Sequence, residues 1–116
     1  MNCAPFIARS FALRTAIHLL HLSSKSYAQH IALNEFYDGI VELTDRFAEV
    51  YMGLEDQVVT WPSVAPPTGE ATELLESYLE LISDEFAEVK SQGLKNILAE
   101  MEELTAQTIY KLVNLK

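Results

Sequence analysis

Three histidines are the side chains in this sequence best suited to bind a metal ion. His18, His21 and His30 lie within 13 residues of one another, and the chain contains no other histidine. Histidine is the commonest metal ligand in proteins and binds as a neutral imidazole. The spacing of His18 and His21 places both on one face of a helix. A lone histidine is more often a hydrogen-bonded core residue, but a cluster of three favours metal binding and that structural role about equally.

Two carboxylates could supply further ligands. Asp45 and Glu49 are four residues apart, so on a helix they lie one turn apart and about 40° around the axis from each other. Such a pair can bind one cation. The pair can equally be a buried or half-buried cap on a polar network. Most of the other acidic residues have the spacing of solvated helix faces.

Apolar residues recur at helical spacing through most of the chain, and turn residues divide it into four segments. Pro5 suits the first turn of a helix, Ser26 and Thr68 are candidate N-caps, and Gly53 is a typical residue just after a helix. The expected helices span about 4–22, 27–52, 68–90 and 93–114. The predicted core-facing stripe of the second helix includes Ile31, Asn34, Tyr37, Val41, Thr44, Ala48 and Tyr51.

This pattern predicts an all-α protein with one domain over residues 1–116, because the chain is too short for two cores. A four-helix bundle with a long crossover between the second and third helices accommodates the segments. His30 and Asp45 are 15 residues apart on one helix, which corresponds to about 22 Å. They cannot bind the same ion from one subunit. Either the two residues are unrelated, or two copies of the second helix pack antiparallel across a two-fold axis and share the site.

The distribution of charge narrows the possible partners. The chain has 17 acidic and 8 basic side chains and a net charge of −9, which argues against binding DNA or RNA. Residues 1–34 contain no acid and carry +3, whereas the 17 acids and five bases of residues 35–116 give −12. The acid-free start could be an organelle-targeting peptide. Because its removal would delete the first helix, we expect it to be retained.

Several common sites and segments are missing from the sequence. The four glycines are isolated, so there is neither a phosphate loop nor a dinucleotide fingerprint. Cys3, the only cysteine, lies at an end expected to fray and has no adjacent base, which argues against nucleophilic catalysis. No stretch is apolar for long enough to span a membrane. A single cysteine fits a reducing compartment, and we expect a protein of the cytoplasm.

The spacing of the candidate ligands resembles that of a known family. His18, His30, Asp45 and Glu49 have the ligand spacing of the Dps mini-ferritins, which belong to the ferritin-like superfamily. His30-Ile-Ala-Leu-Asn-Glu-Phe-Tyr-Asp-Gly and Thr44-Asp-Arg-Phe-Ala-Glu49 resemble the second helix of that family. The segment from His18 to His30 is similar to a group of small tailed-phage proteins. The resemblance covers about residues 15–53, and aligning His21 in place of His18 requires a three-residue deletion, so both histidines stay candidates.

The resemblance implies a ferritin-like bundle that assembles as a two-fold dimer or a closed shell. It implies that the protein binds Fe(II) and oxidises it with hydrogen peroxide or oxygen. The histidines of one subunit would meet Asp45 and Glu49 of its neighbour, and activity should fall below about pH 6.5, where protons compete for imidazole. The Lys-rich tail with which some family members bind DNA is missing, so DNA binding is not implied. The alternative is a non-catalytic helical bundle with a structural or interaction role, for instance in a phage particle.

Overall fold

The computed structural model of the protein describes residues 2–115, and Met1 and Lys116, the two ends of the predicted domain, lie outside the described residues. All regular structure within residues 2–115 is α-helical. The prediction of an all-α chain with four helices is therefore confirmed. The helices are α1 (Ala4–Ser23), α2 (Tyr27–Leu54), α3 (Ala71–Glu88) and α4 (Gln92–Asn114).

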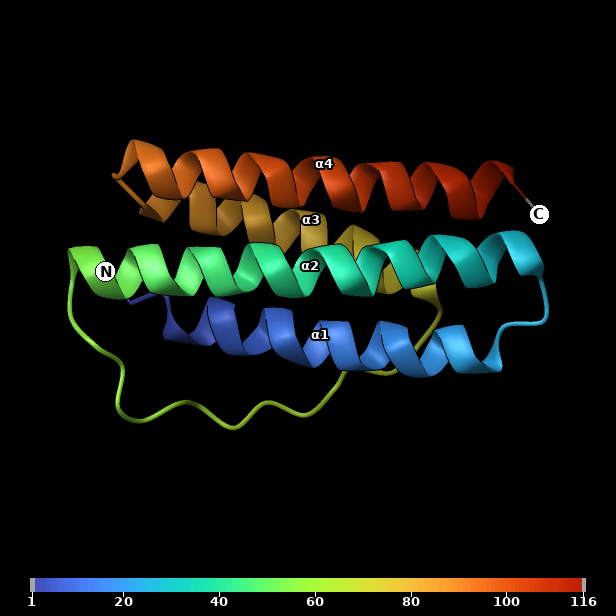
Figure 1. Cartoon of the computed structure of the whole chain (residues 1–116), viewed down its shortest axis with the longest axis horizontal. Helices are drawn as coiled ribbons and strands as arrows, with labels where there is room; N and C mark the ends of the chain where they lie inside the picture. The colour runs from blue at the N-terminus through green and yellow to red at the C-terminus, as the bar shows by residue number, and fades with distance from the viewer. Residues whose placement is uncertain (1, 116) are drawn as a thin grey trace.

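The four helices lie side by side in an elongated bundle of 43 × 26 × 19 Å (Figure 1). α1 and α4 each pack against α2 and α3, and every packed pair runs antiparallel. Residues 24–26 join α1 to α2, and residues 89–91 join α3 to α4. Among the packed pairs, α1 and α3 contact each other least. The side of the bundle between α1 and α3 is therefore its loosest.

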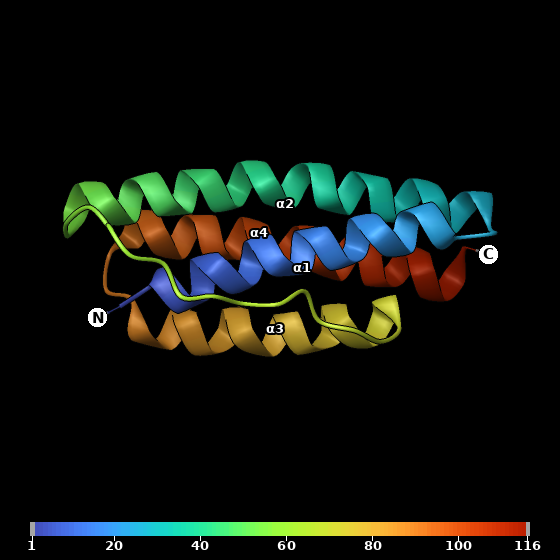
Figure 2. The ribbon, with the colours of Figure 1, turned by 90° about the horizontal axis from the view of Figure 1, so that it is seen from below.

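A connection without regular structure, residues 55–70, leads from α2 to α3. It runs back along the bundle beside α1 and α3, as Figure 2 shows. Its three prolines fix the backbone φ angle and lack an N–H group, which prevents a helix from forming there. Because the connection returns the chain to the opposite end of the bundle, α3 runs in the same direction as α2.

Two ion pairs show how α2 and α4 are aligned. Lys111 contacts Glu35 at 2.6 Å, and Arg46 contacts Glu100 at 2.6 Å. The two ion pairs are eleven residues apart on each helix, so α2 and α4 run antiparallel and stay in register between them. Between these pairs, a Cβ atom at Gly39 would come within 2.9 Å of the Leu104 side chain. Glycine at this position allows the two helices to approach closely.

The centre of the core is aromatic. The Phe6 ring contacts that of Phe47 edge to face, with centres 5.2 Å apart, and lies parallel to that of Tyr78 at 6.1 Å. These contacts join α1, α2 and α3, and each such ring removes a large apolar area from water. Within residues 2–115, the helices do not combine the length and apolar character needed to cross a membrane.

The start of α2 follows the prediction, but its end does not. The Ser26 hydroxyl accepts a hydrogen bond from the N–H of Gln29, so Ser26 is the N-cap as predicted. α2 then continues through Gly53 to Leu54. Gly53 was expected to end the helix, and that prediction is wrong because its backbone does not take the positive φ of a terminating glycine.

The start of α3 also differs from the prediction. Thr68 is not the N-cap, because Gly69 has a φ of +136°, which is incompatible with a helix. The chain turns at this glycine, and α3 begins at Ala71 with Glu70 as its N-cap residue. The other helix ends lie within two residues of the predicted ones.

Candidate metal centre

The three histidines lie together where α1 leads into α2. His18 and His21 are in the last two turns of α1, and His30 is in the first turn of α2. The ring centres of His21 and His30 are 3.7 Å apart, and those of His18 and His21 are 5.9 Å apart. The connection of three residues between the helices brings His30 back against the end of α1. The cluster predicted from sequence therefore exists within one chain.

Tyr37 forms a second layer beside the histidines. Its ring stacks on that of His18, with centres 4.1 Å apart and planes within 14° of parallel. The ring of His21 meets it edge to face at 5.2 Å. The guanidinium carbon of Arg14 lies 5.4 Å from the centre of the Tyr37 ring, within range of a cation–π contact.

Sequence reasoning missed Tyr37 and Arg14 as members of this cluster. The periodicity of the second helix predicts Tyr37 only as part of its buried face, and Tyr37 is indeed buried. The signal that could have identified both residues is helical spacing. Tyr37 follows His30 by two turns, and Arg14 precedes His18 by one turn.

His21 is buried without a hydrogen-bond partner. Its side chain is 6% exposed, and neither ring nitrogen bonds to any group within residues 2–115. Burial lowers the pKa of His21, and the nearby His30 and His18 lower it further, whereas Asp38 acts in the opposite direction. His21 is therefore a neutral imidazole at neutral pH, with a lone pair that no group within residues 2–115 uses. Buried polar groups are nearly always paired, so His21 is an exception, and its ring nitrogens can reach a ligand only if this side chain or its neighbours move.

His30 has the hydrogen bond that is typical of a metal-binding histidine. Its Nδ1 atom lies 3.1 Å from the backbone carbonyl oxygen of His21. A carbonyl oxygen only accepts hydrogen bonds, so Nδ1 carries the proton and Nε2 of a neutral ring keeps the lone pair. Histidines that bind metals commonly donate their other ring N–H to a carbonyl or carboxylate in this way. Nε2 of His30 is therefore the nitrogen available to an ion.

The separations of the rings limit which histidines can share an ion. Two imidazoles that bind one divalent ion at about 2.0–2.1 Å hold their ring centres about 4.5–6.5 Å apart. The 5.9 Å between His18 and His21 falls in this range, and the 3.7 Å between His21 and His30 falls below it. Within residues 2–115, the structure shows no group of three His, Cys, Asp or Glu side chains placed to hold a metal ion. Further ligands would have to come from outside the chain.

Asp45 and Glu49 lie away from the histidines. Both are exposed, and no hydrogen bond or ion pair joins the side chain of either to residues 2–115. The alternative that they belong to a half-buried polar network is therefore wrong. Because α2 is one continuous helix over both sites, Asp45 lies about 22 Å along the helix axis from His30. One chain does not bring the predicted ligands together.

Cys3 does not lie at a fraying end, contrary to expectation. It is fully buried at the N-cap of α1, next to Glu85 of α3. Burial, followed by hydrogen bonding to Glu85, raises the pKa of Cys3 to about 12. The side chain therefore stays a thiol, whereas nucleophiles and metal ligands are thiolates.

The chain matches the model of one protein family over residues 21–112, which is most of its length. The chain belongs to the DUF5856 family. This is described as a family of unknown function. The DUF5856 match begins at His21, includes His30, Asp45 and Glu49, and leaves out His18. No curated protein and no solved structure matches the chain.

Proposed function

We propose that the protein is a Dps-like, iron-binding ferroxidase with a ferritin-like bundle. It oxidises Fe(II) with hydrogen peroxide or oxygen at sites shared between two subunits, and it stores iron if the subunits close into a shell. The observation that carries the proposal is the state of His30, whose Nδ1 donates to a carbonyl while Nε2 is left for an ion. The neutral His21 beside it, whose ring nitrogens have no hydrogen-bond partner within residues 2–115, is a second candidate ligand once its ring moves away from that of His30.

A two-fold dimer would complete the site. If two α2 helices pack antiparallel with the axis near residues 37–38, His30 of each copy lies beside Asp45 of the other, and two equivalent sites form. The outer face of α2 is exposed and so available for this contact, although Glu35 on it also pairs with Lys111 of α4. Successive exposed residues on this outer face are alternately four and three positions apart along the helix. These residues are Ile31, Glu35, Asp38, Glu42, Asp45 and Glu49.

Fe(II) is the substrate in this proposal. His30, with His18 or His21, binds it as a neutral imidazole ligand, and the partner's Asp45 and Glu49 offset its charge and connect it to a second iron. Two Fe(II) ions each lose one electron, and hydrogen peroxide takes up these two electrons and two protons to give two waters. The net charge of −9 raises the local concentration of cations. The same ligands would accept manganese or zinc.

The second candidate is a non-catalytic helical bundle with a structural or interaction role, for instance in a phage particle. The 3.7 Å separation of His21 and His30 favours it, because rings this close must move apart before both can bind one ion. Large apolar side chains near the histidines are also exposed, namely Leu19, Leu22 and Tyr27. Such side chains are suited to contact another protein.

Following ferric absorbance after adding Fe(II) and peroxide tests the proposal. The double variant Asp45→Asn/Glu49→Gln changes two exposed residues and should keep the fold. We expect its initial rate to fall at least about tenfold, because carboxylates supply most of the charge that stabilises Fe(III). The matched control Glu102→Gln/Glu103→Gln, on the exposed face of α4, should keep the wild-type rate. Equal rates in all three proteins, or no rate above that of buffer, would refute the ferroxidase proposal.

A further inference from the structure

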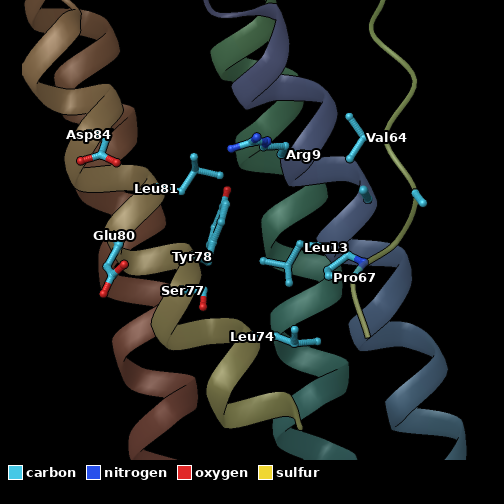
Figure 3. A pocket seen from close by; sticks show the side chains of 12 residues that line it. Arg9, Leu13, Val64, Pro67, Leu74, Ser77, Tyr78, Glu80, Leu81 and Asp84 are labelled. Atoms are coloured by element: carbon cyan, nitrogen blue, oxygen red, sulfur yellow. The ribbon is translucent and has the colours of Figure 1, made fainter. Parts of the chain in front are cut away.

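A cavity of about 390 Å³ lies on the loosest side of the bundle, between α1 and α3. Residues of the 55–70 connection line part of its outer side. Figure 3 shows its walls: Leu13 comes from α1, Leu74 and Leu81 come from α3, and Val64 and Pro67 come from the connection. The volume falls within the range of about 300–1,000 Å³ that is usual for small-molecule sites.

The floor of the cavity is apolar, although Tyr78 forms part of it. The Tyr78 hydroxyl lies 2.7 Å from Ser10 Oγ, and Ser10 Oγ donates its own proton to the Phe6 carbonyl at 2.9 Å. The Tyr78 hydroxyl is therefore the donor in its bond with Ser10. Its polar atom is occupied inside the protein, and only the ring is left to face a ligand. The floor can therefore hold an apolar group but gives it no hydrogen bond.

Charged side chains of both signs line the opening. Arg9 of α1 is exposed and forms no ion pair or hydrogen bond within residues 2–115, and in Figure 3 its guanidinium extends into the gap toward Leu81. Glu80 and Asp84 lie on the α3 side. They are four residues apart and so share one face of that helix. The Arg9 guanidinium therefore lies on the α1 side of the apolar floor, and the carboxylates of Glu80 and Asp84 lie on its α3 side.

We propose that this cavity binds a small zwitterion with an apolar side chain, of the class of the hydrophobic α-amino acids. The carboxylate of the ligand pairs with Arg9, which can form two parallel hydrogen bonds to it. Its ammonium group lies toward Glu80 and Asp84. The side chain packs on Leu13, Tyr78 and their apolar neighbours. This site uses none of the residues of the proposed metal centre, so an experiment that refutes one proposal leaves the other unaffected.

The arrangement of charges selects against ligands with one charge. A carboxylate without an ammonium group meets repulsion from Glu80 and Asp84, and an amine without a carboxylate meets repulsion from Arg9. Both ligands also leave part of the rim unpaired. A zwitterion satisfies both sides at once, and this is the physical basis for the expected selectivity.

Isothermal titration of the full chain with L-phenylalanine, phenethylamine and 3-phenylpropionate tests the proposal. We expect L-phenylalanine to bind at least about tenfold more tightly than either singly charged analogue. Arg9→Gln and Asp84→Asn should each weaken its binding about tenfold, since each removes a charge-assisted hydrogen bond. The controls Lys90→Gln and Glu103→Gln remove charges outside the cavity and should leave its affinity unchanged.

Filling the cavity gives an independent readout. Ser77 is exposed on α3 and lines the cavity, so Ser77→Trp should block L-phenylalanine without changing any charge. Circular dichroism confirms that each variant keeps its helix content. The proposal is overturned if L-phenylalanine does not bind, if an analogue with one charge binds as tightly, or if Ser77→Trp binds like the wild type.

Discussion

The rings of His21 and His30 lie against each other with their centres 3.7 Å apart and their planes tilted by 31°, and the His21 carbonyl oxygen lies 3.1 Å from Nδ1 of the His30 ring. One residue thus contacts the other through both its side chain and its backbone. This relationship fixes the orientation of His30 and directs its Nδ1 inward, while His21 is left buried and unpaired. It is the structural basis of the proposed metal centre, and it has consequences for stability that can be measured without metal.

Replacing His21 by leucine should stabilise the metal-free protein. His21→Leu removes a buried polar ring that has no hydrogen-bond partner within residues 2–115 and introduces an apolar side chain of similar size. We expect its Tm, followed by circular dichroism in the presence of EDTA, to rise by a few degrees Celsius. His18→Leu is the control, because His18 is only half-buried and stacks on Tyr37. A lower Tm for His21→Leu would show that the His21 ring has a stabilising partner.

The lowered pKa of His21 makes stability depend on pH. The unfolded chain binds a proton at this residue near pH 6.5, whereas the folded protein binds it only at lower pH. The unfolded state therefore holds more protons below about pH 6.5, and the folded state loses stability as the pH falls through that range. Above about pH 6.5, the contribution of His21 to the unfolding free energy no longer changes with pH.

Urea unfolding at pH 5, 6, 7 and 8 measures this dependence as the difference between wild type and His21→Leu. The advantage of the variant should grow as the pH falls below about 6.5. Burial raises the pKa of Glu85, so this residue changes the unfolding free energy with pH in the opposite direction. Glu85 is present in both proteins, and its effect therefore cancels in the difference between them. A difference that stays constant from pH 8 to pH 5 would contradict the account.

The Ser10–Tyr78 hydrogen bond should contribute to the stability of the core. Ser10→Ala leaves the buried Tyr78 hydroxyl without its partner, which should cost about 1–3 kcal/mol of unfolding free energy. Tyr78→Phe removes the donor, but Ser10 keeps its bond to the Phe6 carbonyl, so the loss should be smaller. Urea denaturation compares the two variants. A larger loss for Tyr78→Phe would show that the hydroxyl of Tyr78 has a further role.

The proposed dimer places two Asp38 side chains near its two-fold axis. Asp38 is exposed on the outer face of α2, and its carboxylate accepts a hydrogen bond from the Asn34 amide. Because like charges repel across an interface, Asp38→Asn should tighten the metal-free dimer several-fold in sedimentation equilibrium. Glu103→Gln on α4 is the control for the change in net charge. An unchanged dissociation constant would place the dimer interface elsewhere.

The fold could be predicted from sequence to the extent that local signals determine it. Amphipathic spacing predicts the four helices, and Ser26 caps α2 because its hydroxyl reaches an N–H three residues away. Ile31 shows the limit of this reasoning. It was predicted to face the core but is 38% exposed, because α2 packs between α1 and α4 on a face rotated toward Phe36 and Ile40.

The candidate site depended more on tertiary contacts. The spacing of His18 and His21 on one helix face is local and could be predicted. The contact between the rings of His30 and His21 depends on the path of residues 24–26, and the layer formed by Tyr37 depends on how α1 packs against α2. Cys3 is buried in the core and lies beside Glu85 of α3, which is 82 residues away in the sequence. Periodicity holds no information on such contacts.

Mixing two inactive variants tests the central claim, a ferroxidase site shared between subunits, most directly. One variant lacks the ligand histidines (His18→Ala/His21→Ala/His30→Ala), and the other lacks the carboxylates (Asp45→Asn/Glu49→Gln). A dimer of one copy of each contains one intact site and one empty site, because the intact halves come from different chains. After co-refolding, random pairing predicts Fe(II) oxidation at about a quarter of the wild-type rate, although each variant alone is inactive. A mixture as inactive as its components, beside an active wild type, would contradict a site shared between two chains.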